Sequence, residues 1–149
     1  RQQSVKNGID VVPDADIILV HDAARCLTPP EVMVRVRDAI VAGHAGAVPG
    51  LPVTDTLKEV TPHHMFEPVV DTLNRIVFRH VQTPQGFDGE ILRRAHEQVW
   101  PGEDGAPDDA SLVEYLGHDV VIVRGSVMAM KVTTAFDLKL AELLLVESA

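Results

Sequence analysis

A charged cluster follows a short apolar run near the start of the chain. His21, Asp22 and Arg25 come directly after the apolar residues 17–20, and only two alanines separate Asp22 from Arg25. A carboxylate in this position can bind a divalent cation or a ribose hydroxyl, and an arginine can bind a phosphate in bidentate fashion. The two alanines allow a nucleotide to approach the backbone closely. The cluster therefore predicts a binding site for a phosphorylated ligand.

Two further polar clusters lie at predicted strand ends, and the segment that precedes them carries additional polar groups. The clusters are Gln82-Thr83-Pro84-Gln85 and Lys131-Val132-Thr133-Thr134, and the segment adds Asp55, Thr56, Lys58 and Arg75. In open α/β sheets, ligands bind beyond the carboxyl ends of the strands. Cations and hydroxyls around one carboxylate suit phosphoryl or nucleotidyl transfer, because there the protein mainly positions groups and neutralises developing charge.

Motifs, net charge and apolar content of the sequence argue against several other classes of function. No Ser-His-Asp spacing, CxxC pair or HExxH motif occurs, so covalent catalysis and zinc hydrolysis lack support. The net charge of −9 argues against a nucleic-acid partner but leaves room for a few well-placed cations. No apolar run approaches the ~20 residues of a membrane span, so no membrane partner is expected. The single cysteine, Cys26, suits a reducing cytoplasm.

The elements that position these clusters can be predicted from alternating strand-like and helix-like patterns in the sequence. These patterns predict an α/β class with a mainly parallel sheet in a single domain over residues 1–149. The expected strands are 17–20, 46–53, 77–81, 119–124 and 130–133, and the expected helices are 28–43, 87–99, 108–116 and 134–147. Thr28 and Glu31 resemble a capping box for the first of these helices. The run 17–20 shows no alternation, which is typical of a strand buried on both faces.

Residues 54–78 have a different character from the rest of the chain. Two short β-prone pieces, 56–60 and 69–72, are joined by Thr61-Pro62-His63-His64. This pattern predicts a protruding β-arm rather than a part of the core.

Six stretches of the sequence, in order, resemble one enzyme family. They are RQQSVKNG at 1–8, VHDAAR at 20–25, PVTDTLK at 52–58, RHVQTPQGF at 79–87, DDASLVEYLG at 108–117 and KVTTAFDLKLAE at 131–142. The family is that of 2-C-methyl-D-erythritol 4-phosphate cytidylyltransferase, a nucleotidyltransferase of non-mevalonate isoprenoid biosynthesis. The resemblance implies a Rossmann-like nucleotidyltransferase fold and a homodimer whose β-arms interlock.

The resemblance also implies the reaction and the residues that perform it. The family joins CTP and methylerythritol phosphate to 4-diphosphocytidyl-2-C-methyl-D-erythritol and pyrophosphate, with Mg²⁺ or another divalent cation. The implied catalytic residues are Lys131, Asp22 and Arg25, with Asp22 also near the metal and the cytidine. The implied alcohol-phosphate contacts are Thr56, Arg75, Thr83 and Arg25, of which Thr56 and Arg75 would reach into the partner's site. Ser4 and Ala23 match residues beside the cytidine.

The sequence departs from the family pattern in two ways. Cys26, Pro107 and Met130 replace a proline, a threonine and an asparagine that are frequent in the family. The family also opens with a strand and a glycine-rich triphosphate loop, which has no equivalent in these 149 residues. We therefore expect a partial cytidylyltransferase domain that lacks the N-terminal strands, is nearly inactive on its own, and exposes strand 17–20 as a sheet edge until another segment or chain covers it. Two alternatives remain: a pentitol-phosphate cytidylyltransferase, and a non-catalytic dimerisation fragment.

Overall fold

A computed structural model describes residues 2–98, 100–101 and 105–147. The α-helices are α1 (Gln2–Asp10), α2 (Pro30–Val41), α3 (Gly89–Glu97), α4 (Asp109–Tyr115) and α5 (Ala135–Glu147). The strands are β1 (Ile17–Val20), β2 (Gly46–Pro52), β3 (Leu57–Val60), β4 (Val69–Leu73), β5 (Arg79–Val81), β6 (Gln85–Asp88) and β7 (Val120–Arg124). Two short 3₁₀ helices complete the set, η1 (Arg75–Val77) and η2 (Val127–Ala129). No described helix is long and apolar enough to cross a membrane.

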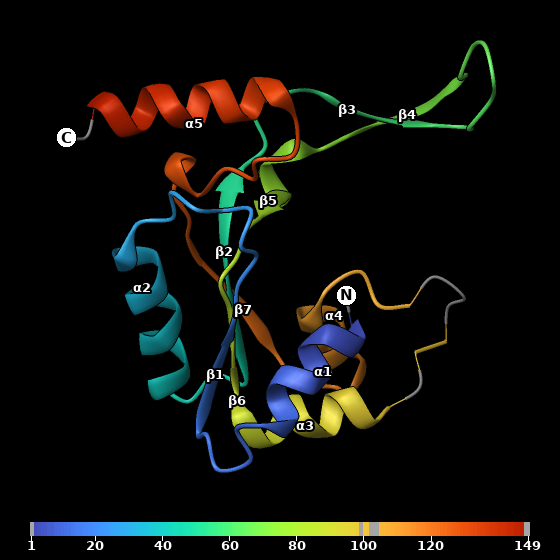
Figure 1. The fold of residues 1–149 in the computed structure, drawn as a ribbon. Helices are drawn as coiled ribbons and strands as arrows, with labels where there is room; N and C mark the ends of the chain where they lie inside the picture. Colours follow the sequence, from blue (N-terminus) through green and yellow to red (C-terminus); the bar gives the residue numbers. More distant parts are fainter. Residues whose placement is uncertain (1, 99, 102–104, 148–149) are drawn as a thin grey trace.

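The central sheet contains five strands, with β2 in its middle (Figure 1). One side of β2 pairs in parallel with β7, and the other side pairs antiparallel with β6 and then with β5. Strand β1 adds to β6, again antiparallel. The predicted α/β class is confirmed. We expected a mainly parallel sheet. Strands β1, β2 and β7 run in the same direction. However, β6 lies between β1 and β2, so only β2 and β7 are adjacent parallel strands.

Helices cover both faces of this sheet (Figure 1). On one face, Val36 and Ile40 of α2 pack against Ala47 of β2. On the other face, Val48 of β2 joins a larger core with Phe87 and residues of α1, α3 and α4. Adjacent residues of β2 thus point to opposite faces, as a strand requires. Strands β2 and β6 are therefore mostly buried between these helices, and the loops at the strand ends carry the polar clusters.

Close packing of α2 on the sheet depends on a glycine in β6. A Cβ atom on Gly86 would overlap the side chain of Val36 and would lie 2.7 Å from Leu19 Cδ2. Glycine at this position in a strand permits the close approach of a neighbouring element.

Strand β1 differs from its sequence-based prediction in burial but not in position. Residues 17–20 form a strand as predicted, yet Leu19 is 38% exposed, so the prediction of burial on both faces is wrong. The reason is the sheet order, in which β1 lies at an edge and pairs with β6 alone among the described strands. The expectation that this strand forms an open sheet edge is confirmed for the described residues.

Three other local predictions are wrong. Phe87 was expected in a helix but lies in β6, and α3 begins at Gly89 after the Asp88 side chain accepts a hydrogen bond from Ile91 N. The last residue of that expected helix, Val99, lies outside the described residues. Residues 130–133 form no strand. Helix α2 begins at Pro30 without a side-chain cap, because the Thr28 hydroxyl donates to Arg25 O instead.

Residues 57–73 form a hairpin separate from the central sheet. Strands β3 and β4 pair antiparallel with Leu57 opposite Leu73, and the hairpin projects away from the body of the molecule (Figure 1). Apolar side chains on and beside it are exposed, including Phe66, Val69, Val70, Ile76 and Val77. A hairpin this poorly packed within its own chain has few intrachain contacts to hold it in place.

Candidate functional site

Four of the residues selected from the sequence line one cavity at the strand ends. We call it the Asp22 cleft; it has a volume of about 180 Å³. It is lined by Asp22, Arg25, Val81, Gln82, Thr83, Gln85, Pro107, Asp108 and Lys131. Asp22, Arg25, Thr83 and Lys131 therefore converge, although up to 109 residues separate them in the sequence.

The carboxylate of Asp22 lies between two cations. Lys131 Nζ is 3.1 Å from Asp22 Oδ2, and Arg25 Nε is 3.7 Å from the same oxygen. Arg25 also donates from Nη1 to Ala129 O at 2.7 Å. The side chain of Lys131 is 49% exposed, whereas that of Arg25 is only 13% exposed. Lys131 can therefore move toward a bound ligand, while Arg25 is held in one orientation.

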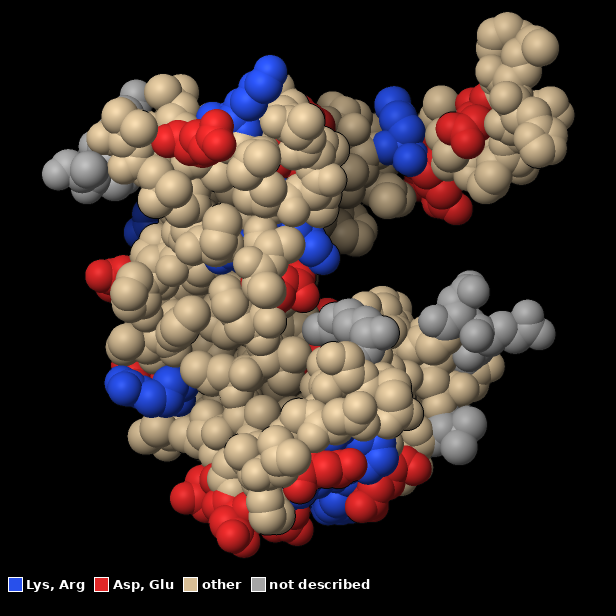
Figure 2. Space-filling model, in the orientation of Figure 1, with Lys and Arg blue, Asp and Glu red and all other residues tan. Residues whose placement is uncertain are grey.

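The cleft is electrically balanced in a single chain. Asp22 and Asp108 carry negative charge on its wall, and Arg25 and Lys131 carry positive charge. The face in Figure 2 is hollowed below the hairpin, and basic and acidic side chains both lie along the hollow. The pKa of the Glu114 carboxyl in α4 is raised, mainly because of burial and secondarily because of the negative charge of Asp108. A phosphorylated ligand in this cleft would bring negative charge that the cleft by itself does not neutralise.

An interruption between β5 and β6 brings Thr83 to the cleft. These two strands pair with successive parts of β2, but the register slips between Val81, opposite Gly50, and Gly86, opposite Ala47. The slip leaves Gln82, Thr83 and Pro84 outside the ladder and yet buried, with a cis peptide bond before Pro84. The Thr83 hydroxyl accepts from Asp22 N at 3.0 Å and shares a hydrogen bond of 3.0 Å with His21 Nδ1. Thr83 therefore fixes the backbone that carries Asp22.

Gln85 connects the cleft to the start of α4. Its Nε2 donates to Asp108 Oδ2 at 2.7 Å, and its Oε1 accepts from Ala110 N at 3.2 Å. Asp108 Oδ1 accepts from Ser111 N at 2.9 Å, so Asp108 is both the cap of α4 and part of the cleft wall. The sequence predicted a functional cluster at residues 82–85, but it did not assign roles to the two glutamines or to Asp108. The only signal for the two glutamines was their position at a strand end, and for Asp108 its position at the start of a predicted helix.

The segment after Lys131 is held by two sets of hydrogen bonds. Val132 N donates to Ala24 O at 2.8 Å, which ties it to the loop that carries Asp22. Asp137 Oδ2 accepts from Thr133 N at 3.0 Å and from Thr134 N at 2.8 Å, and Asp137 N donates to Thr134 Oγ1. These reciprocal bonds between Thr134 and Asp137 form a capping box at the start of α5. The backbone directly after Lys131 is therefore held in place at Val132 and at Thr133 and Thr134.

These hydrogen bonds predict an unusual titration of Asp137. Bonds from the backbone N–H groups of Thr133 and Thr134, and from their hydroxyls, lower the pKa of Asp137 from 3.8 to about 2. Because the folded-state pKa is depressed, the stabilising effect of the capped carboxylate is fully present above pH 3.8 and is lost as the pH falls through about 2. NMR titration of the Asp137 carboxyl carbon should give the low midpoint, and Thr134→Ala should raise it. A midpoint at the ordinary value in the folded protein would contradict the cap.

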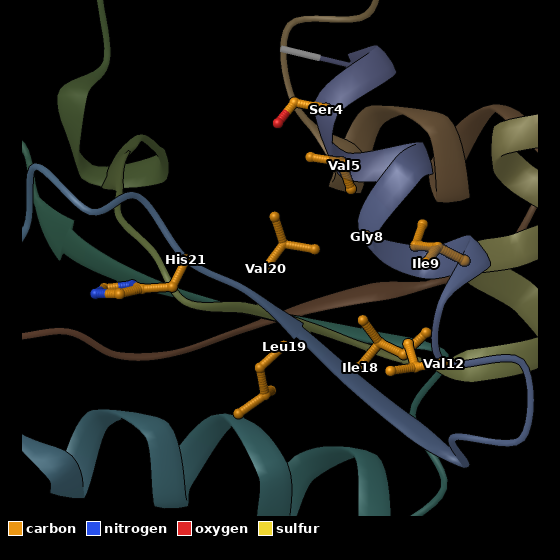
Figure 3. A pocket seen from close by; sticks show the side chains of 9 residues that line it. All are labelled: Ser4, Val5, Gly8, Ile9, Val12, Ile18, Leu19, Val20 and His21. Carbon is orange, nitrogen blue, oxygen red and sulfur yellow. The ribbon is translucent and has the colours of Figure 1, made fainter.

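Ser4 lies outside the Asp22 cleft. It lines a groove of about 330 Å³ between α1 and β1, and the side chains around it include Val5, Val20 and His21 (Figure 3). Ala23 lies in the turn after β1, directly after Asp22. His21 links the two cavities, because it lines the α1–β1 groove and also contacts Thr83 of the cleft.

Thr56 and Arg75 do not reach the Asp22 cleft of their own chain. Both are exposed, Thr56 just before β3 and Arg75 in η1. Arg75 lines a separate cavity of about 540 Å³ at the base of the hairpin, together with Thr54, Ile76 and Arg79 among others. If these two residues serve the cleft, they must do so in another copy of the chain.

Comparison with known proteins finds a family model and several relatives that carry the same description. The family model described as 2-C-methyl-D-erythritol 4-phosphate cytidylyltransferase matches residues 1–147. A protein of that name from Streptomyces avermitilis is 50% identical over 97% of this chain and 58% of its own length. The namesake from Rhodococcus jostii is 47% identical over 100% of this chain and 63% of its own length. The chain thus spans about six tenths of these relatives.

A solved structure supports the same relationship at the level of the fold. The crystal structure of 2-C-methyl-D-erythritol 4-phosphate cytidylyltransferase from Thermus thermophilus superposes with a TM-score of 0.84 at 39% sequence identity. The superposition covers 97% of this chain and 68% of that structure. The similarity therefore extends over nearly all of the present chain.

Proposed function

The chain belongs to the 2-C-methyl-D-erythritol 4-phosphate cytidylyltransferase family, and from this premise we propose that it is part of an enzyme that joins CTP to 2-C-methyl-D-erythritol 4-phosphate and releases pyrophosphate. The observation that carries the proposal is the convergence of Asp22, Arg25, Thr83 and Lys131 on one cleft. In our proposal residues 1–149 form one partial cytidylyltransferase domain, with residues 54–78 as its β-arm. The single cysteine supports a cytoplasmic location.

The cleft residues divide the work of nucleotidyl transfer. An oxygen of the 4-phosphate attacks the α-phosphorus of CTP, a new P–O bond forms, and the bond to the β-phosphate oxygen breaks. Negative charge on the α-phosphate oxygens must be stabilised as this happens. We assign that task to Lys131, whose ammonium group is exposed beside Asp22. Arg25 and the Thr83 hydroxyl are assigned to hold the alcohol phosphate, and Ser4 and Ala23 to the cytidine.

Asp22 fits a divalent cation held jointly with the nucleotide. The described residues include no group of three or more His, Cys, Asp or Glu side chains that could hold a metal ion. Mg²⁺ commonly binds through one or two carboxylates and substrate phosphates, so a single carboxylate at the cleft is sufficient for this mode. Mg²⁺, when bound, would neutralise charge on the triphosphate. Asp22, whose Oδ2 now faces Lys131 and Arg25, is the residue that would hold it.

A second copy of the chain completes the site in our proposal. The Asp22 cleft carries two cations and two carboxylates, so an arginine from outside would favour phosphate binding. Arg75 is exposed at the base of the projecting hairpin and outside the cleft of its own chain. We propose that the hairpins of two copies interlock in a homodimer and deliver Arg75 and Thr56 to the opposite cleft. The exposed apolar side chains of the hairpin support an interface there.

Pyrophosphate release from CTP tests the proposed reaction directly. The protein expressed from its complete gene should release pyrophosphate with CTP, Mg²⁺ and methylerythritol phosphate. A pentitol phosphate, offered in a parallel assay, should be a poor substrate. Faster turnover of the pentitol phosphate would assign the chain to the alternative enzyme. Absence of CTP binding by calorimetry, in a stable dimer, would instead indicate a non-catalytic dimerisation unit.

A further inference from the structure

The side chain of Gln82 makes a set of hydrogen bonds that no assigned function uses. Gln82 is 6% exposed and lies in the interruption between β5 and β6. Its Nε2 donates to Ser126 O at 2.8 Å and, less closely, to Ala129 O at 3.4 Å, while its Oε1 accepts from Ser126 N at 3.0 Å. We call these contacts the Gln82 clamp. Through these contacts, one buried amide is hydrogen-bonded to the residues at both ends of the η2 turn.

The chemistry of the clamp selects glutamine at this position. A backbone carbonyl can only accept and a backbone N–H can only donate, so the partners of the amide fix its orientation. A glutamate carboxylate could accept from Ser126 N but could not donate to Ser126 O, and methionine could do neither. Gly125 makes room for the amide, because a Cβ atom there would overlap Gln82 Oε1. The clamp therefore depends on two residues, Gln82 and Gly125.

The clamp connects to both cations of the Asp22 cleft. Ala129 O, one acceptor of the Gln82 amide, also accepts the hydrogen bond from Arg25 Nη1. Lys131 follows two residues later, and Val132 N is anchored to Ala24 O on the loop of Asp22. The backbone of Lys131 is thus fixed before it by the clamp and after it by Ala24. Loss of the clamp would remove the Gln82 bonds from the leading side, which would keep only the bond from Arg25 Nη1 to Ala129 O among these contacts, and would leave the trailing side in place.

We propose that Gln82 is a positioning residue of the cytidylyl-transfer site that holds Lys131 in its productive orientation. This inference rests on the proposed function and adds a residue to it. Gln82 touches neither substrate nor metal in this account; it acts through the η2 turn. Small displacements of a catalytic group can lower a rate by orders of magnitude, so the effect should appear in kcat rather than in the KM for CTP.

A double-mutant cycle with Lys131 tests the proposal in the protein expressed from its complete gene. Gln82→Met should lower kcat about tenfold, with the KM for CTP nearly unchanged. In a Lys131→Ala background the same substitution should lower kcat less than about twofold, because the group it positions is gone. Equal losses in both backgrounds would mean a merely structural role and would overturn the proposal. So would an unchanged kcat in Gln82→Met. Gln98→Met, at an exposed position after α3, is the control for the substitution itself.

A second variant and a second readout keep the test decisive. Gly125→Ala leaves Gln82 in the chain but displaces its amide, so it should reproduce the loss of kcat if Gln82→Met does not fold. Amide hydrogen exchange at Ser126 should accelerate at least about tenfold in Gln82→Met, whether or not the enzyme turns over. Unchanged exchange at Ser126 would overturn the clamp. A wild-type protein without product formation, but with the clamp detected by exchange, would instead refute the proposed function.

Discussion

Replacing Lys131 with alanine should lower the kcat of cytidylyl transfer by about a hundredfold or more, while the KM for CTP changes by less than about threefold. The ammonium group of Lys131 lies 3.1 Å from Asp22 Oδ2 and is half exposed at the cleft. It is thus free to leave the carboxylate and follow the charge that develops on the α-phosphate. Removal of one such stabilising donor costs roughly 3 kcal/mol of barrier, which corresponds to a rate factor of 10².

The Lys131 experiment has a matched control in the same chain. Lys139 lies in α5, is exposed, and is outside the Asp22 cleft. Lys139→Ala removes the same charge from the protein and should leave kcat unchanged. Steady-state rates of pyrophosphate release at saturating and limiting CTP separate the two parameters. An unchanged kcat in Lys131→Ala would remove this residue from the catalytic set, and a rise in KM alone would assign it to ground-state binding.

The convergence of the cleft residues could be predicted from the sequence because it follows from strand topology. Asp22 comes directly after a strand, and Thr83 lies at the break between two strands that pair with β2. Strand β6 runs antiparallel to β1, so the start of β6 at Gln85 lies opposite the end of β1 at Val20, and this brings Thr83 to the edge that carries Asp22. Lys131 was expected there although its predicted strand does not exist. Lys131 nevertheless lies at the cleft, because the hydrogen bond from Val132 N to Ala24 O holds the adjacent backbone beside the loop of Asp22.

The supporting contacts could not be predicted because their partners are distant in sequence. The amide of Gln82 binds residues 44 and 47 positions away, and Gln85 binds Asp108, 23 positions away. Local propensity carries no information about such pairs. The same limit explains β6, since Phe87 begins an apolar spacing that resembles a helix, and its pairing with Ile18 of β1 and Gly46 of β2 makes it a strand residue. Tertiary contacts overrode the local pattern there.

The charge balance of the cleft connects the Lys131 experiment with the question of the second copy. Two cations face two carboxylates in one chain, whereas the proposed substrates bring a triphosphate and a monophosphate. The protein expressed from its complete gene can add charge from other segments, and Mg²⁺ adds more. Of the two residues that the family resemblance directs to a partner's site, Arg75 is the one that carries positive charge. Its role can be tested without knowledge of the remaining segments.

Arg75→Ala and Lys131→Ala chains, each nearly inactive alone, should together recover activity when their subunits exchange. A heterodimer has one cleft with Lys131 from one chain and Arg75 from the other, while its second cleft lacks both. Since half of randomly mixed dimers are heterodimers, roughly a quarter of wild-type activity should return. Circular dichroism should show both variants folded, because Arg75 is exposed in η1 and its side chain is not part of the core.

A mixture of two cleft variants separates recovery by a shared site from other effects of mixing. Asp22 and Lys131 lie in the same cleft of the same chain, 3.1 Å apart. In a heterodimer of Asp22→Asn and Lys131→Ala, each cleft carries one defect, so this mixture should stay inactive. Recovery in the Arg75 mixture alone therefore requires that Arg75 acts across the dimer. If the Arg75 mixture stays inactive while subunit exchange is demonstrated by mass-labelled chains, the two residues act within one chain, and the hairpin has no part in the opposite site.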